Sequence, residues 1–234
     1  MEQFEVWAKY QENFDKIGKS ADNVIIVEDF LDESDRIKIV DYLNTHREDP
    51  EFSGGKDLRD SQVIRENPEI YGFMKKYESE IYKIATEHFT NKYGIELEQK
   101  PWNSLHFVKW SPDMASGLHS DCQHPNGDPL WKGNYYKLNI SALIYPNDDY
   151  EGGHITFPPY DIDIKPKAGT LVIFPSNNYY AHEVTRVDSG IRYTMPMWLT
   201  FKMGFSGPMV QYNHGDSKGL WRNIGEDDSD LRSY

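Results

Sequence analysis

Residues 170–201, TLVIFPSNNYYAHEVTRVDSGIRYTMPMWLTF, indicate the fold class of this chain. They contain two apolar runs, TLVIF and IRYTMPMWLTF, with Pro, Ser, Asn and Gly between them. Short apolar runs bounded by turn residues are typical of β-strands. The same pattern continues upstream to residue 104 in the runs SLHFVKW, GLHSD, YYKLNISALIY and GHITF. Many short strands with frequent turns predict a barrel or a two-sheet jelly roll, which encloses a cavity.

The first 95 residues show mostly helical periodicity. Residues 4–17 have apolar side chains at helical spacing, and Asp32 is a suitable N-cap for a second helix. A strand is expected at NVIIVEDF, residues 23–30, and Asn67-Pro68 and Gly94 are start and stop signals of a third helix. The faces expected to be buried carry Phe4, Trp7, Phe14 and Ile17 in the first helix, Ile37, Val40 and Leu43 in the second, and Ile70, Phe73, Tyr77, Ile81, Ile84 and His88 in the third.

These patterns predict one domain that is mainly β with a helical flank. At 234 residues, the chain has the size at which a barrel with flanking helices forms a single unit. We expect a double-stranded β-helix, a jelly-roll and cupin-like barrel, in residues 96–205. A helix-rich flank in residues 1–95 would pack against it, and residues 206–234 would form a C-terminal extension.

Composition and charge limit the partners and the compartment. The net charge is -13, and residues 1–100 hold 23 acidic and 14 basic residues against 10 and 8 in residues 101–205. Such a surface repels phosphate backbones, so nucleic acid is not expected as a partner. The single cysteine, Cys122, excludes an intrachain disulfide framework and favours a reducing compartment. The sequence shows no apolar leader and no stretch of membrane length, so we expect a cytoplasmic protein that binds no membrane. We expect it to be a monomer or a homodimer.

Three residues have the pattern of a metal site. His119 and Asp121, in LHSD, are two positions apart, so in a strand both side chains point to the same face. His182, far downstream in YYAHEV, would complete a set of two histidines and one carboxylate when a closed sheet brings it close. This facial triad leaves coordination positions open on non-haem Fe(II). The other histidines fit ordinary roles better, with His124 in a turn, His106 in packing or beside the ligands, His154 next to a glycine turn, His88 in the core, and His46 and His214 on the surface.

Arg192 follows His182 after VDSG, which suits a tight hairpin between Val184 and Tyr193. On a neighbouring strand, an arginine a few residues along would lie about 10 Å from the metal, at roughly 3.3 Å per residue. That distance matches a small dicarboxylate bound to iron at one end. A guanidinium group would then hold the far carboxylate of 2-oxoglutarate through two hydrogen bonds.

The region from Trp102 to Phe201 resembles the 2-oxoglutarate and Fe(II) dependent dioxygenases, and within them the prolyl 4-hydroxylase-like branch. The resemblance is carried by HSDCQHPNGD, SALIYPNDDYEGGHITFP, PKAGTLVIFPS and AHEVTRVDSGIRYTMPMW, in that order. It implies iron ligands at His119, Asp121 and His182, and it places Arg192 and Tyr145 on the distal carboxylate of 2-oxoglutarate. The chain departs from the family at Trp110, where a tyrosine is frequent, and at Pro196, where a small or hydroxylated residue is common.

The same resemblance implies an activity. Fe(II), 2-oxoglutarate and O2 would be used, with ascorbate in support, and succinate and CO2 would be released while an unactivated C–H bond is hydroxylated. The expected acceptor is a peptidyl proline in an extended or polyproline II conformation, as for procollagen-proline 4-dioxygenases. Two alternatives remain open, a hydroxylase of a small metabolite or another side chain and a catalytically silent metal- or ligand-binding barrel.

A polypeptide acceptor would enter between two glycine-containing loops, FSGGKDLRD at residues 52–60 and WKGNYYK at residues 131–137. Loops of this kind often order over an extended chain. Trp110, Tyr135 and Tyr136 are the expected substrate residues, with Lys132 and Lys137 along the path. Cys122, next to Asp121, would face the other side of the strand and be buried and inert. Trp198 is expected in the wall or core, and Asn139 and Thr194 are possible contacts of the cosubstrate.

Overall fold

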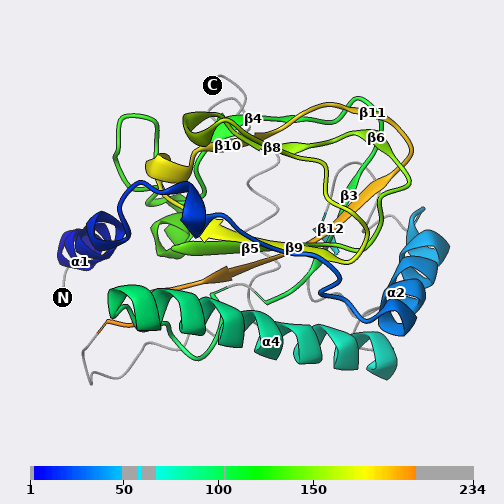
Figure 1. The fold of residues 1–234 in the computed structure, drawn as a ribbon, viewed down its shortest axis with the longest axis horizontal. Coiled ribbons are helices and arrows are strands. Elements are labelled where there is room, and N and C mark those ends of the chain that lie inside the picture. The colour runs from blue at the N-terminus through cyan, green and yellow to red at the C-terminus, as the bar shows by residue number, and fades with distance from the viewer. Residues whose placement is uncertain (1–2, 49–56, 59–66, 103, 204–234) are drawn as a thin grey trace.

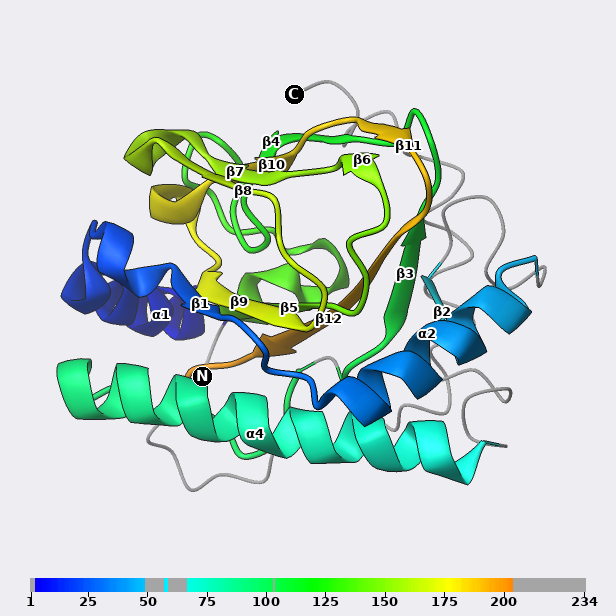
Figure 2. The ribbon, with the colours of Figure 1, turned by 45° about the vertical axis from the view of Figure 1, so that its right-hand side comes forward.

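The computed structural model describes residues 3–48, 57–58, 67–102 and 104–203. Two antiparallel sheets face each other, and helices cover the outer side of the larger sheet (Figure 1). Figure 2 shows the space between the sheets from a second direction, with α4 lying along the outside. The predicted architecture, a mainly β barrel packed against N-terminal helices, is confirmed.

Among the described residues, the larger sheet has six strands in the order β1-β9-β5-β12-β3-β2, and the smaller sheet has four in the order β4-β10-β7-β8. The strands β11 and β6 form a separate pair. Side chains alternate along each strand, so every second residue points into the space between the sheets. The strands are β1 (Ile25–Val27), β2 (Asp57–Leu58), β3 (Phe107–Trp110), β4 (Ser116–His119), β5 (Ile140–Tyr145), β6 (Glu151–Gly152), β7 (Ile155–Phe157), β8 (Ile162–Ile164), β9 (Thr170–Pro175), β10 (His182–Val184), β11 (Val187–Ser189) and β12 (Arg192–Leu199).

The helices are α1 (Gln3–Ile17), α2 (Glu33–His46) and α4 (Pro68–Tyr93), with short 3-10 turns η1 (Ala21–Asn23), η2 (Lys132–Lys137), η3 (Pro158–Tyr160) and η4 (Asn178–Tyr180). The helix α4 begins and ends as predicted. The Asn67 side chain accepts a hydrogen bond from the Ile70 backbone N–H at 3.1 Å, and Gly94 ends the helix with φ 67°.

The buried faces of the three helices differ from the predicted ones, and in α1 the expected Phe4 is exposed while Tyr10 is buried. In α4 the buried apolar stripe runs through Met74, Ala85 and Phe89 as well as the expected Ile70, Tyr77 and Ile81. In α2, Ile39, Tyr42 and Leu43 are buried while Ile37 is exposed, because the helix is rotated relative to the expected face. Asp32 is the N-cap residue but makes no capping hydrogen bond, since its carboxylate pairs with Lys76 of α4.

The predicted hairpin between Val184 and Tyr193 is wrong. Val187–Ser189 form β11, which pairs with β6, so β10 and β12 are not neighbours. The strand β10 pairs with β4 and β7 in the smaller sheet, whereas β12 pairs with β3 and β5 in the larger one. His182 and Arg192 therefore stand on opposite walls of the barrel.

The N-terminal flank packs directly against the barrel and adds a strand to its larger sheet. The strand β1 extends the larger sheet beside β9, and Tyr10 and Phe14 of α1 pack edge-on against Phe201, with ring centroids 6.1 and 5.1 Å away. Apart from β2, the predicted loop at residues 52–60 lies outside the described residues, as does the predicted extension at residues 206–234. None of the described helices has the length and apolar character that a membrane crossing needs.

Candidate metal centre

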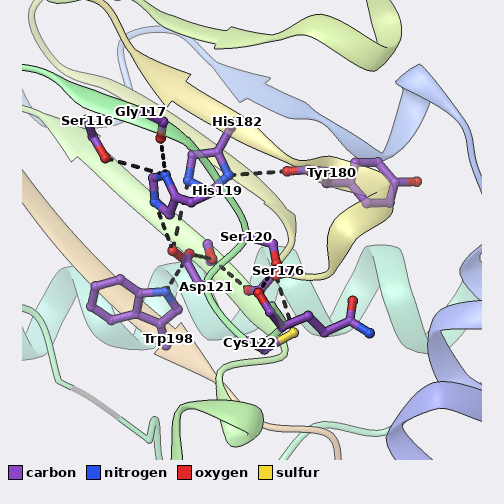
Figure 3. A network of polar contacts seen from close by, with 12 residues as sticks. Ser116, Gly117, His119, Ser120, Asp121, Cys122, Ser176, Tyr180, His182 and Trp198 are labelled. Atoms are coloured by element: carbon purple, nitrogen blue, oxygen red, sulfur yellow. Dashed lines mark hydrogen bonds and ion pairs between the residues drawn. The ribbon is translucent and has the colours of Figure 1, made fainter. Parts of the chain in front are cut away.

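His119, Asp121 and His182 come together at one end of the space between the sheets (Figure 3). His119 and His182 are directly paired across β4 and β10. Asp121 lies just after β4 and is held there because its backbone N–H donates to the Ser176 carbonyl at 3.1 Å. One ligand atom from each residue lies within 4.8 Å of the other two. The three predicted ligands thus surround a space for one ion.

Backbone carbonyls orient both imidazole rings. His119 Nδ1 lies 2.7 Å from the Gly117 carbonyl, and His182 Nδ1 lies 3.2 Å from the Tyr180 carbonyl. A proton on each Nδ1 donates to that carbonyl, which leaves the Nε2 lone pair free. Both Nε2 atoms face Asp121 Oδ1, at 3.5 Å for His119 and 3.9 Å for His182. Two imidazole nitrogens and one carboxylate oxygen therefore point at a common centre.

The other carboxylate oxygen of Asp121 is already bound. Oδ2 accepts a hydrogen bond from Ser141 Oγ at 2.5 Å. It accepts a second one from the Trp198 indole Nε1 at 2.9 Å (Figure 3). Two donors on Oδ2 fix the plane of the carboxylate and direct Oδ1 toward the histidines. Asp121 is thereby prepared as a ligand through a single oxygen.

The protonation states of two of the three residues suit a metal site. Burial, together with the charge of His119, lowers the pKa of His182 to about 4, so this imidazole is neutral near pH 7. Burial acts to raise the pKa of Asp121, but His119, His182 and Ser141 hold it well below its usual range. A neutral imidazole and an ionised carboxylate are the forms that bind a metal. The pKa of His119 is raised, because the Asp121 carboxylate outweighs the effect of burial, so a metal ion competes with a proton for this imidazole.

We expect Trp198→Phe to weaken Fe(II) binding about tenfold. The change removes the indole donor to Asp121 Oδ2 but keeps an aromatic ring against His106, whose centroid lies 5.7 Å from that of Trp198. Loss of a partner that orients a metal ligand typically costs roughly 10- to 100-fold in affinity. Competition with a chromogenic chelator under anaerobic conditions measures the effect. Trp102→Phe, at a tryptophan that packs against Lys137, is the matched control, and equal affinities of the two variants would contradict the prediction.

A cavity of about 200 Å³ connects the triad to Arg192, which lines it from the opposite sheet. The guanidinium carbon lies 5.0 Å from the ring centroid of Trp110 and 5.2 Å from that of Tyr145. Arg192 is 1% exposed, and its Nε and Nη1 atoms have no hydrogen-bond partner among the described residues. The Tyr145 hydroxyl is likewise buried without a partner there. A buried cation with unused donors is a site for an anion.

The remaining predicted residues fall into two groups. Trp110 and Thr194 line the cavity, and the Trp110 indole donates to Thr194 Oγ1 at 3.2 Å. Tyr135 and Tyr136 do not line it. Tyr136 is buried because η2 packs onto α1, and its ring centroid lies 6.3 Å from that of Tyr10. The expected path along η2, with Lys132 and Lys137, is therefore not found at this cavity. Cys122 is buried as expected, and burial raises the pKa of its thiol. Among the other histidines, His124 lies in a turn, His106 lines the cavity, His154 pairs with Asp163, and His88 is hydrogen-bonded to Asn23. The Asn139 side chain is hydrogen-bonded to the backbone of Tyr136 and Phe201.

Three residues of this region were not singled out from the sequence: Ser141, Asn147 and Tyr150. Ser141 shares a strand face with Tyr145 four positions later, so an inward polar residue in ISALIY was the available signal. Asn147 and Tyr150 lie between β5 and β6 and have no such periodic signal. Only the tertiary structure places them next to Arg192.

The comparisons with known proteins agree with this geometry. The model of the 2OG-Fe(II) oxygenase superfamily matches residues 105–200. Human prolyl 3-hydroxylase 2 is 34% identical over 97 residues, which cover 38% of this chain and 14% of that protein. The chain thus spans a small part of the length of that relative.

Two solved structures share the fold at low sequence identity. A prolyl 4-hydroxylase from Phytophthora capsici has a TM-score of 0.60 at 18% identity and covers 92% of this chain and 75% of its own. A prolyl hydroxylase from Trichoplax adhaerens, in complex with a hypoxia inducible factor peptide fragment, has a TM-score of 0.56 at 13% identity and covers 86% and 94%. The superfamily match includes His119, Asp121, His182 and Arg192, so residues 105–200 are similar to the 2OG-Fe(II) oxygenases, and the fold is prolyl hydroxylase-like.

Proposed function

We propose that this protein hydroxylates a peptidyl proline in a reaction that consumes 2-oxoglutarate and O2 and releases succinate and CO2. The observation that carries the proposal is the position of the two parts of the site. The triad and the unpaired donors of Arg192 lie on opposite sheets but line the same cavity. A small dicarboxylate bound at the triad could therefore extend through this cavity and place its second carboxylate at the guanidinium group.

The residues present fit both groups. His119, Asp121 and His182 would hold Fe(II) through the atoms that already converge, and Arg192 and Tyr145 would hold the distal carboxylate. When bound, Fe(II) and 2-oxoglutarate supply oxidative decarboxylation coupled to the insertion of one oxygen atom into a C–H bond. Ser141 and Trp198 keep the Asp121 carboxylate oriented, while apolar side chains such as Leu143 and Phe174 limit water in the cavity.

A proline acceptor is supported by the relatives and by the rim of the cavity. Human prolyl 3-hydroxylase 2 and the two solved structures are prolyl hydroxylases by name. His119 lines the cavity and is 40% exposed at its side chain, so the metal end of the cavity is open to solvent. An extended polypeptide could present a proline ring at that opening, whereas an enclosed site would admit only a small molecule.

The test is an assay of the purified protein with Fe(II), 2-oxoglutarate, ascorbate and a panel of proline-containing peptides. We expect succinate formation and, by mass spectrometry, a gain of one oxygen atom on proline in at least one peptide. Comparison with authentic 3- and 4-hydroxyproline then assigns the ring position. The His182→Ala variant is the negative control.

The alternatives give different results in the same assay. Succinate formation with hydroxylation only of free metabolites would replace the peptide acceptor by a small molecule. Binding of iron without any consumption of 2-oxoglutarate would indicate a silent barrel. Either result contradicts the proposed acceptor.

A further inference from the structure

Tyr150 is a buried tyrosine next to Arg192 to which no role has been given so far. It lies between β5 and β6 and is 3% exposed. Its hydroxyl has no hydrogen-bond partner among the described residues. A buried hydroxyl without a partner costs roughly 1 to 3 kcal/mol, and a ligand that accepts its hydrogen bond would remove this cost.

Gly153 shows how close Tyr150 and Arg192 are. A Cβ atom at this glycine would lie 2.8 Å from Cδ of Arg192 and 3.3 Å from Cε2 of Tyr150. The methylene chain of Arg192 and the Tyr150 ring, on the side near its hydroxyl, therefore both pack against Gly153. Gly190, with φ 78°, allows the turn before Arg192 to lie against the backbone of Tyr150, where a Cβ would be 2.8 Å from Cα.

Asn147 ties the two segments together. Its Nδ2 donates to the Ile191 carbonyl at 2.8 Å, and its Oδ1 accepts from the Tyr193 backbone N–H at 2.9 Å. The Asn147 side chain thus makes the hydrogen bonds to Ile191 and Tyr193 that a neighbouring strand would otherwise make. Tyr150, three residues after Asn147, is held in a fixed position relative to the guanidinium group.

The charge of Arg192 acts on both tyrosines. Burial raises the pKa of Tyr150 and of Tyr145, and Arg192 opposes this effect in each case without cancelling it. Both hydroxyls therefore keep their protons and can donate. Together with Nε and Nη1 of Arg192, they provide four donor atoms that lack partners among the described residues. An ionised carboxylate has about four acceptor positions.

We propose that Tyr150 is a specificity-determining residue that donates a hydrogen bond to the distal carboxylate of the bound dicarboxylate, beside Arg192 and Tyr145. This inference rests on the proposed function, because it assigns Tyr150 to the site of 2-oxoglutarate. Two consequences follow. Tyr150 favours a 2-oxo dicarboxylic acid over a monocarboxylic acid of the same length, and it contributes equally to binding of succinate, which carries the same distal carboxylate.

The experiment measures binding to the Fe(II)-loaded protein without oxygen, for wild type and Tyr150→Phe. Calorimetric titration with 2-oxoglutarate should show about tenfold or greater weakening in the variant, as expected for one hydrogen bond to a charged group. Succinate, measured by competition, should weaken by a similar factor. Binding of 2-oxopentanoate, which lacks the distal carboxylate, should change less than about twofold, because the lost hydroxyl has no partner on that ligand.

Tyr160→Phe is the matched control, since the Tyr160 hydroxyl is also buried without a partner among the described residues but its ring packs against Tyr180. It should leave all three affinities unchanged. Equal 2-oxoglutarate affinity of Tyr150→Phe and wild type would overturn the inference while leaving the proposed function intact. Equal weakening of 2-oxoglutarate and 2-oxopentanoate would also overturn it, as a purely structural effect. If wild type binds Fe(II) but not 2-oxoglutarate, the proposed function fails as well.

Discussion

Fe(II) binding by the His182→Ala variant should be weaker than wild type by about a hundredfold or more, and succinate formation should be lost. Four-ligand zinc sites bind with roughly 10 to 16 kcal/mol, or about 2.5 to 4 kcal/mol for each ligand. Loss of one ligand of that value corresponds to a factor of roughly 70 to 900. His182 is the buried member of the triad, so water replaces its imidazole less readily than it would at the more exposed His119. Anaerobic competition with a chromogenic chelator measures the affinity.

His154→Ala is the matched control for this variant. His154 lies just before β7 in the same small sheet, but its imidazole contacts Asp163 on the surface. Its loss should leave both iron affinity and turnover near wild type. Melting temperatures of both variants show whether the fold is retained. Iron affinity that is unchanged in His182→Ala would exclude this residue as a ligand.

Arg192→Met should have opposite effects on ligand binding and on stability. The affinity for 2-oxoglutarate should fall by about a hundredfold or more, because removal of one partner from a desolvated charge pair costs roughly 3 to 5 kcal/mol. Without ligand, the variant should be more stable than wild type by about 1 to 4 kcal/mol, since an apolar side chain replaces a buried cation with unsatisfied donors. At roughly 2 to 4 °C per kcal/mol, this gain is visible in thermal denaturation. Calorimetric titration measures the affinity.

Arg186→Met provides the comparison. Arg186 is 64% exposed at its side chain and pairs with Asp113 and Asp188, outside the cavity. Its replacement should change neither affinity nor stability by a measurable amount. An Arg192→Met protein that binds 2-oxoglutarate as well as wild type, or that melts well below it, would contradict the role of Arg192 as an anion anchor.

The fold class was predictable because strand and helix patterns are local. Turn residues separate the short apolar runs after residue 96, and α4 carries both its cap signals in the sequence. Strand pairing was not predictable in the same way. Whether residues 185–191 form a hairpin turn or a strand depends on β6, more than 30 residues upstream, and the sequence of the turn alone favours the hairpin.

The candidate site shows the same division. The triad and Arg192 could be proposed from residue type, spacing and resemblance, and the structure brings them to one cavity. The assignment of Tyr136 to the substrate path followed from its place in a long loop after the metal strand. Its burial against Tyr10 depends on how α1 docks, which no local pattern records. Asn147 and Tyr150 were missed because their significance lies in contacts with residues 190–193, about 40 residues downstream.

The Tyr180 side chain connects the candidate metal centre to the N-terminal part of the chain. The carbonyl of Tyr180 supports His182, while its hydroxyl accepts from Asn23 Nδ2 at 2.8 Å and donates to the Gly18 carbonyl at 2.9 Å. The support of a metal ligand is thus anchored in residues 18–23, far upstream of the segment that matches the superfamily. A fragment of residues 105–200 would contain all the ligands but lack this anchor, the outer strand β1 and the helices that cover the larger sheet. We therefore expect residues 105–200 alone not to fold in a way that brings the three candidate ligands together.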